Sequence, residues 1–250
     1  MTELELLLDL FKNTERQGPG SPEDTRRALS FVELPSDEQL QVADIGCGSG
    51  GQTLTLAEHL SGNITAVDLF PSLLDELNDQ VWAKGLENRI QTRSESMENL
   101  SFESGSLDLI WSEGAIYNMG FENGIRQWKQ YLKPQGYLAV SELTWITPER
   151  PAEIEKYWTQ EYPEIDTAAI KIRLLEKHGY TLTGYFHLPR ESWWEHYYMP
   201  LQACFAPFLE RQAHTEAARN IVAEHQQEIE LFEKYHAYFS YGFYIARNNE

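Results

Sequence analysis

One short segment of the sequence combines glycines with an acid in a way that suits ligand binding. It runs from Val42 to Gly51, reads VADIGCGSGG, and joins the end of an apolar run to the start of a helical pattern. Glycines let a backbone turn tightly and approach a ligand without a Cβ in the way. A second acid, Asp68, follows Gly48 by twenty residues at the end of the next apolar run. A carboxylate there can accept hydrogen bonds from both hydroxyls of a ribose, so the two motifs together favour a nucleoside-containing ligand.

Three interpretations of the glycine segment compete. The first is a structural turn without a ligand. The second is a dinucleotide site, because Gly46, Gly48 and Gly51 fit the spacing G-x-G-x-x-G. The third is a site for S-adenosylmethionine. Asp44 separates the last two, since an acid two residues before Gly46 would repel a pyrophosphate but suits a ligand with an ammonium and a sulfonium. We therefore favour S-adenosyl-L-methionine as the cofactor.

Strand and helix patterns alternate around this segment. Short apolar runs predict strands, and apolar residues three and four apart predict helices. The expected strands cover 40–45, 63–67, 89–93, 107–111, 137–141, 181–188 and 239–247. The expected helices include one that opens the chain, one that begins at Pro22, one from the glycine turn to Leu60, and those at 71–84 and 125–132. This alternation predicts an α/β fold with a doubly wound, mostly parallel sheet and helices on both faces.

Four ordered motifs resemble those of the class I S-adenosylmethionine-dependent methyltransferases. The glycine segment and Asp68 match the first two motifs of that family. The segments 96–102 and 105–110 match the third region, and 132–138 matches the turn into the fifth strand. The resemblance covers roughly residues 40 to 143 and is strongest to small-molecule enzymes of the ubiquinone and menaquinone methyltransferase subgroup. It implies a Rossmann-like methyltransferase fold with seven strands, of which the one near 239–247 is antiparallel.

The resemblance also assigns roles along the chain. The methionine end of the cofactor would meet the start of the glycine turn and the end of the fourth strand, the ribose would meet the end of the second strand, and the adenine would meet the region after the third. Residues 16–21 look like a lid found in a subgroup of bacterial methyltransferases. The expected cofactor-binding residues are Gln17, Gly18, Asp44, Gly46, Gly48, Gly50, Asp68, Leu69, Ser96, Met97 and Glu113. The family usually has an acid where this chain has Ser96; a serine hydroxyl can still accept a bond from the adenine amino group, without charge assistance.

The acceptor side of the reaction is expected in the aromatic last third of the chain. Methyl transfer is an in-line displacement, so the enzyme mainly aligns the acceptor and excludes water. Tyr117, Trp145, Trp193 and Tyr197 are the expected pocket residues. Tyr117, His187 and Glu195 are candidates for a catalytic base, which a phenol or acidic carbon would need and a neutral amine would not. An aromatic, acidic cap suits a flat or cationic small acceptor.

Composition narrows the class of protein. The chain has 250 residues and a net charge of −19, and Arg26-Arg27 is its only adjacent basic pair. Such a chain would be repelled by nucleic acid and by anionic membranes. The acidic start is unlike a targeting peptide, so we expect a cytoplasmic protein, as a monomer or a homodimer. The two cysteines, Cys47 and Cys204, match no metal spacing, and we expect no metal.

A single domain accommodates these features. We expect residues 1–28 as an N-terminal lid, 29–189 as the core, 190–236 as a helical cap insertion and 237–250 as the last strand. The predicted function is methyl transfer to the N, O, S or C atom of a small molecule. Three alternatives stay open: an NAD(P)-dependent oxidoreductase, a non-catalytic cofactor-binding protein of the same fold, and a nucleic-acid methyltransferase, which the charge disfavours.

Overall fold

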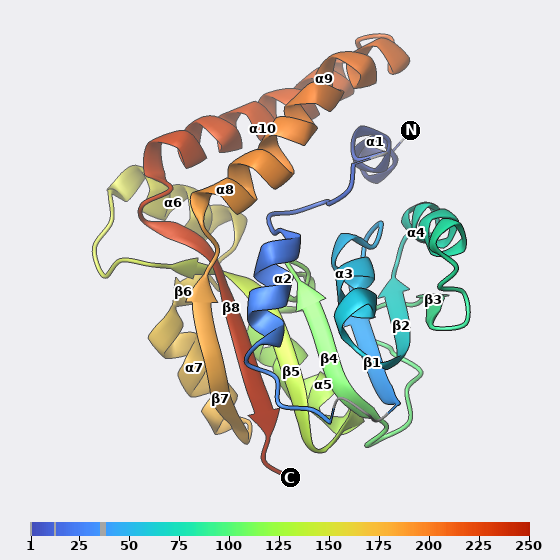
Figure 1. Ribbon diagram of the computed structural model, residues 1–250. Coiled ribbons are helices and arrows are strands. Elements are labelled where there is room, and N and C mark those ends of the chain that lie inside the picture. Colours follow the sequence, from blue (N-terminus) through green and yellow to red (C-terminus); the bar gives the residue numbers. More distant parts are fainter. Residues whose placement is uncertain (1, 13, 36–38) are drawn as a thin grey trace.

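A central eight-stranded sheet organises the chain in the computed structural model, which describes residues 2–12, 14–35 and 39–250 (Figure 1). Seven strands lie in the order β3-β2-β1-β4-β5-β8-β7, and the short β6 pairs with β5. The strands are β1 (Leu40–Ile45), β2 (Gly62–Asp68), β3 (Ile90–Ser94), β4 (Leu107–Glu113), β5 (Leu132–Trp145), β6 (Asp166–Thr167), β7 (Tyr180–His187) and β8 (Phe239–Asn248).

The pairing is parallel except at β8, which runs antiparallel to both β5 and β7. This confirms the predicted mostly parallel, doubly wound sheet with an antiparallel strand near residues 239–247. The strand order reverses at β1, which lies between β2 and β4. In open α/β sheets, a ligand crevice forms beyond the carboxyl ends of the strands at such a reversal.

Helices cover both faces of the sheet. They are α1 (Glu3–Leu10), α2 (Pro22–Leu29), α3 (Gly51–His59), α4 (Pro71–Lys84), α5 (Phe121–Trp128), α6 (Ala152–Glu161), α7 (Ala168–Lys177), α8 (Arg190–Trp193), α9 (Met199–Arg211) and α10 (Glu216–Tyr235). Two 3-10 turns, η1 (Ile116–Met119) and η2 (Lys129–Tyr131), and a π-helical turn, η3 (Trp194–Tyr198), complete the set.

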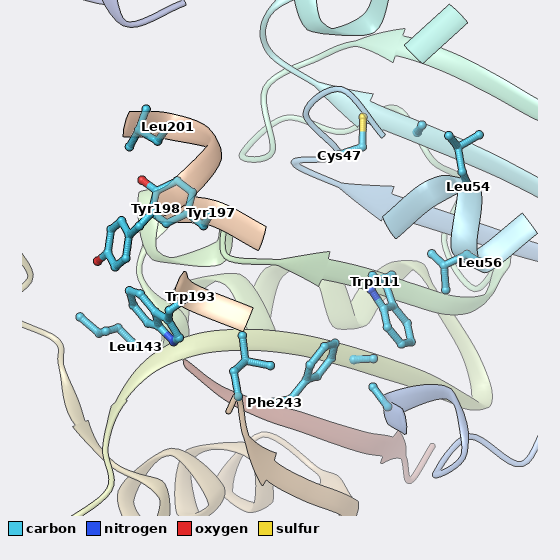
Figure 2. Packing of buried hydrophobic residues seen from close by; sticks show 14 of the residues in the cluster. Cys47, Leu54, Leu56, Trp111, Leu143, Trp193, Tyr197, Tyr198, Leu201 and Phe243 are labelled. Carbon is cyan, nitrogen blue, oxygen red and sulfur yellow. The ribbon is translucent and has the colours of Figure 1, made fainter. Parts of the chain in front are cut away.

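Side chains that alternate along the strands form the core on each face. Val42 and Trp111 belong to the cluster under α3, α4 and the C-terminal helices, whereas Ala43 and Ile110 belong to the cluster under α5 and α7. Figure 2 shows the first cluster, in which Trp111 meets Phe243 with ring centroids 5.3 Å apart. Both faces of the central strands are therefore buried, as a parallel sheet requires.

The C-terminal helices α9 and α10 lie beyond the carboxyl ends of β1, β2 and β4 (Figure 1). The N-terminal segment packs between them and the core. Gly20 donates its N–H to the carbonyl of Ser192 in α8, at 3.3 Å. The buried Asp24 of α2 accepts hydrogen bonds from the hydroxyls of Ser21 and Ser192, at 2.6 and 2.5 Å. The N-terminal segment and the helices between β7 and β8 thus lie at the same edge of the sheet (Figure 1).

The observed elements differ from expectation in two places. The fifth strand begins at Leu132, because the predicted turn at 133–136 continues the pairing with β4 across a register irregularity. The helix before it starts at Phe121, four residues earlier than predicted. Helices α6 and α7 and the strand β6 lie in a stretch for which the sequence patterns predicted no element. None of the helices in the described ranges has the length and apolarity needed to cross a membrane.

Candidate functional site

A cavity of about 400 Å3 lies at the carboxyl edge of the sheet, where the strand order reverses. It is lined by the ends of β1, β2 and β4, by the segment after β3, and by the N-terminal segment 16–19. The expected residues that line it are Gln17, Gly18, Gly46, Gly48, Asp68, Leu69, Ser96, Met97, Glu113 and Tyr117. Sequence motifs from five separate parts of the chain therefore meet around one space.

Hydrogen bonds to neighbouring segments hold the glycine turn after β1 in place. The N–H groups of Gly46 and Cys47 donate to the carbonyl of Val67, at 2.8 and 3.0 Å. Gly48 donates to Oδ2 of Asp68 at 2.9 Å, and Ser49 donates to Oε1 of Gln17 at 3.0 Å. These amides are consequently not available to an anionic ligand.

Gly46 has a positive φ of 73°, and a Cβ there would lie 2.3 Å from the Cβ of Ala115. Both facts require glycine at this position: the left-handed backbone disfavours other residues, and the adjoining chain leaves no room for a side chain. Gly46 and Ala115 both line the cavity at this point.

Asp68 joins the glycine turn to the cavity wall. Its Oδ2 accepts from Gly48, and its Oδ1 accepts from the N–H of Phe70 at 3.0 Å. Burial raises the pKa of the Asp68 carboxyl, and the backbone hydrogen bonds oppose that shift. Each carboxylate oxygen accepts more than one hydrogen bond, so Asp68 retains acceptor capacity toward the cavity.

Asp44 lies one layer behind the cavity, which corrects its expected contact with the cofactor. The two-residue period of a strand places Asp44 on the same face as Val42, beneath α3. There it is fully buried and accepts hydrogen bonds from Thr53 Oγ1 at 2.5 Å and from Gln52 Nε2 at 3.3 Å. Burial raises the pKa of Asp44 to about 7. Its charge therefore does not separate the cofactor alternatives as the sequence argument assumed. Gln52, which donates to Asp44, does line the cavity.

Glu113, at the end of β4, gathers three donors. Arg16 Nη1 lies 2.7 Å from Oε2, and Oε1 accepts from Thr25 Oγ1 at 2.6 Å and from Trp111 Nε1 at 2.9 Å. The side chains of Arg16 and Glu113 are only 5% and 3% exposed. Within the described residues, Arg16 Nε is buried without a hydrogen-bond partner. A buried ion pair thus anchors the N-terminal segment to the sheet.

Gln17 fastens the same segment to the glycine turn. Its Nε2 donates to Ser49 Oγ at 3.0 Å and to the carbonyl of Thr14 at 3.2 Å, while its Oε1 accepts from the Ser49 N–H. The hydrogen bonds of Gln17 and the ion pair of Arg16 therefore hold this segment in place, and its residues 16–19 line the cavity.

The segment after β3 forms the opposite wall. The Met97 carbonyl accepts from Trp128 Nε1 at 3.0 Å, which fixes the backbone next to Ser96. The neighbouring Glu95 also lines the cavity, but its carboxylate is engaged by the N–H and hydroxyl of Ser101, at 3.0 and 2.5 Å. Leu69 adds an exposed apolar side chain. This wall suits an apolar, planar group with few polar edges.

A second cavity of about 230 Å3 adjoins the first and shares Gln17, Gly18, Gly114 and Tyr117 with it. Tyr117, Trp193 and Tyr197 line this second cavity, as expected of acceptor-pocket residues. The π-helical turn η3 presents Tyr197, and such turns are frequent at functional sites. Figure 2 shows Trp193, Tyr197 and Tyr198 grouped beside Leu143. The two cavities offer a place for a cofactor and a place for a small acceptor, with Tyr117 at their boundary.

Besides Asp44, four expected residues lie outside both cavities. Trp145 is buried against Phe239, with ring centroids 6.5 Å apart, and His187 and Glu195 are exposed on the surface. Gly50 starts α3 with a φ of 92°, and a Cβ there would collide with Leu77. Trp145 and Gly50 thus have packing roles, and the structure does not bring His187 or Glu195 to the site.

Sequence reasoning missed several cavity residues. They include Arg16, Gln52, Glu95 and Asn118 in the first cavity and Glu228 in the second. Three aromatic residues of the second cavity belong to the aromatic part of the chain expected on the acceptor side but were not among the expected pocket residues: Trp158, Tyr162 and Tyr241. The signal for Arg16 was its place beside Gln17 in the lid segment. The others lack a local signature, because packing of distant elements brings them to the site.

Comparisons with known proteins agree with this architecture. Residues 42–136 match a methyltransferase-domain family. The phosphoethanolamine N-methyltransferase of Plasmodium falciparum is 26% identical over 148 residues, which cover 58% of this chain and 51% of that protein. The chain thus spans about half the length of the curated relatives it matches.

Solved structures extend the likeness over the whole chain. An S-adenosylmethionine-dependent methyltransferase from Geobacter sulfurreducens, solved with S-adenosyl-L-homocysteine, gives a TM-score of 0.83 at 16% identity and covers 97% of each chain. The cyclase SpnF gives a TM-score of 0.76 at 18% identity, covering 98% of this chain and 94% of its own. The fold is therefore shared by proteins with different named activities. In its family match over residues 42–136, its motifs and its fold, the chain is similar to class I, S-adenosylmethionine-dependent methyltransferases.

Proposed function

We propose that the chain binds S-adenosylmethionine in the first cavity and transfers its methyl group to a small molecule held in the second. The observation that carries the proposal is the adjacency of the two cavities, with the glycine turn and Asp68 in one and an aromatic lining in the other. When bound, S-adenosylmethionine supplies a sulfonium-activated methyl group.

The residues of the first cavity fit that cofactor. Asp68 offers a carboxylate for the ribose hydroxyls, and Met97 and Leu69 offer apolar contacts for the adenine. The guanidinium group of Arg16, a residue that lines this cavity, suits the carboxylate of the methionine part. Arg16 is the single cationic side chain among the residues that line this cavity, and the acidic side chains outnumber it. This excess of acids favours a ligand with net positive charge at its reacting end.

The hydrogen bonds of the glycine turn argue against a dinucleotide. In dinucleotide sites the pyrophosphate lies against glycine-rich backbone at a helix N-terminus. Here Gly48 and Ser49 direct their N–H groups to Asp68 and Gln17. With those donors engaged and with Glu113 nearby, two phosphates would meet more repulsion than attraction.

The named substrates of relatives give candidates for the acceptor. The relatives include methyltransferases of phosphoethanolamine, demethylrifamycin and tocopherol, which differ in the atom methylated. The shared feature is a small or moderately sized organic acceptor, and we carry only that class to this chain. We also propose that residues 1–28 act as a lid and 190–236 as a cap over both ligands.

Transfer of label from methyl-labelled S-adenosylmethionine to a mixed panel of amines, phenols and carboxylates tests the proposal. We expect label in at least one organic product, together with formation of S-adenosylhomocysteine. Cofactor binding without transfer to any acceptor would favour the non-catalytic alternative, which the cyclase of the same fold keeps open. Reduction of NAD by an alcohol panel would favour the oxidoreductase.

A further inference from the structure

The second cavity has an unusual lining for its size. Six aromatic side chains surround it, from η1, α6, α8, η3 and β8 and the residue after α6: Tyr117, Trp158, Tyr162, Trp193, Tyr197 and Tyr241. Trp193 lies edge-on to Tyr241 at a centroid distance of 5.0 Å, and Tyr117 lies edge-on to Tyr162 at 6.0 Å. Aromatic rings therefore make up much of the lining, and the π-faces of such rings attract cations.

The charged residues of this lining are both acidic. They are Glu161, at the end of α6, and Glu228, on α10. Tyr198 donates its hydroxyl to Glu228 Oε1 at 2.7 Å, which fixes the carboxyl group. Burial raises the pKa of Glu228, while His225 opposes that shift and Glu161 reinforces it. An unpaired carboxylate is therefore costly in this position, and a bound cation would offset that cost.

No lysine, arginine or histidine lines the second cavity in the described part of the chain. The buried Lys171 has its ammonium 5.3 Å from the Tyr162 ring centroid but is engaged elsewhere. It pairs with Glu142 at 3.4 Å and donates to the carbonyl of Glu164 at 3.0 Å. Arg16 lines only the first cavity and pairs with Glu113. A phosphate group on the acceptor would therefore meet two carboxylates and no free cation.

We infer that the second cavity is a subsite for an organic ammonium group, so that the acceptor is a small amine without a phosphate. This rests on the proposed function and deepens it. It also separates this chain from the phosphoethanolamine substrate in the name of one relative. In the reaction, the ammonium first releases a proton to water. The nitrogen lone pair then forms the bond to the methyl carbon, the carbon–sulfur bond breaks with its electron pair staying on sulfur, and the positive charge passes to the methylated nitrogen.

Calorimetric titration with three probes of similar shape tests the inference, with and without saturating S-adenosylhomocysteine. Choline carries a quaternary ammonium, which cannot be methylated; 3,3-dimethylbutan-1-ol is its neutral carbon isostere; phosphocholine adds a phosphate. We expect choline to bind roughly ten- to a hundredfold more tightly than the isostere, and phosphocholine to bind more weakly than choline. Equal binding of choline and the isostere, no binding of choline, or tighter binding of phosphocholine would each overturn the inference.

Two matched variants localise the effect. Glu228→Gln keeps an oxygen for the Tyr198 hydroxyl and removes the charge, so choline binding should weaken about tenfold or more while binding of the isostere stays unchanged. Glu230→Gln, an exposed position on the same helix, should leave both affinities unchanged. An unchanged choline affinity in Glu228→Gln would remove this carboxylate from the subsite. If the unmodified protein does not bind S-adenosylhomocysteine, the proposed function is refuted. Titrations of choline without S-adenosylhomocysteine distinguish that result from a failure of the ammonium subsite alone.

Discussion

Replacement of Glu113 by glutamine tests how the N-terminal segment is held over the cofactor cavity. Glu113→Gln removes one charge and preserves shape. Its carbonyl oxygen can still accept from Thr25 and Trp111, but its amide group would then face the guanidinium of Arg16, where the structure now has a 2.7 Å ion pair. The variant therefore leaves a buried cation without its partner.

The expected size of the effect follows from the burial of the pair. With side-chain exposures of 5% and 3%, loss of one partner should lower the free energy of unfolding by about 3 kcal/mol. For a chain of this length that corresponds to a fall in Tm of about 6–12 °C. Urea unfolding followed by circular dichroism measures the difference. The double variant Arg16→Met, Glu113→Gln should recover a large part of it, because no unpaired charge remains.

An exposed ion pair provides the control. Lys84 and Glu58 lie 3.8 Å apart and are about half exposed, so Glu58→Gln should change the free energy of unfolding by less than about 1 kcal/mol. A cost below about 1 kcal/mol for Glu113→Gln as well, or a double variant no more stable than the single one, would refute the claim that a buried charge pair anchors the segment.

Three further predictions concern the site. Asp68→Asn should weaken binding of S-adenosylhomocysteine by about 1–3 kcal/mol in calorimetry, because charge-assisted hydrogen bonds are lost. The control Asp75→Asn, on the exposed face of α4, should leave the affinity unchanged. Equal affinities for the two variants would remove Asp68 from the site. The pKa of Asp44 is raised to about 7 in the folded protein, so the native state keeps a proton that the unfolded chain releases above about pH 4. The free energy of unfolding should therefore fall by up to about 4 kcal/mol as pH rises from about 4 to 7. Asp44→Asn should lack this component and gain stability relative to the unmodified protein across that range, and parallel pH–stability curves would contradict the assignment. Gln17→Ala removes the clasp to Ser49 and should speed dissociation of S-adenosylhomocysteine in stopped-flow measurements by about tenfold; an unchanged rate would show that the segment does not restrain the ligand.

Much of the fold follows from local sequence signals. Helix α4 lies where Pro71 and Gly85 predicted its ends, because proline suits the first turn and glycine adopts the left-handed conformation after the last, with φ 66°. Strand β1 lies where the apolar run 40–45 predicted it. The glycine turn and Asp68 meet because parallel strands end at one edge of the sheet.

Other features depend on contacts that no local pattern encodes. The Arg16–Glu113 pair joins positions 97 residues apart, and the π-helical turn that presents Tyr197 has no sequence signature. Asp44 does not line the cavity, for a reason that the sequence contained: strand alternation places it on the Val42 face, beneath α3. The acceptor cavity was predicted only as an aromatic composition, since its walls come from separate elements.

Binding of S-adenosylhomocysteine to the purified protein tests the central claim most directly, by calorimetric titration with NAD as the control ligand. A dissociation constant near the micromolar range for S-adenosylhomocysteine, with one site per chain and no heat from NAD, is the result expected from the cavity geometry. No binding, or a preference for NAD, would contradict the assignment of the glycine turn, Asp68 and the lid segment to S-adenosylmethionine.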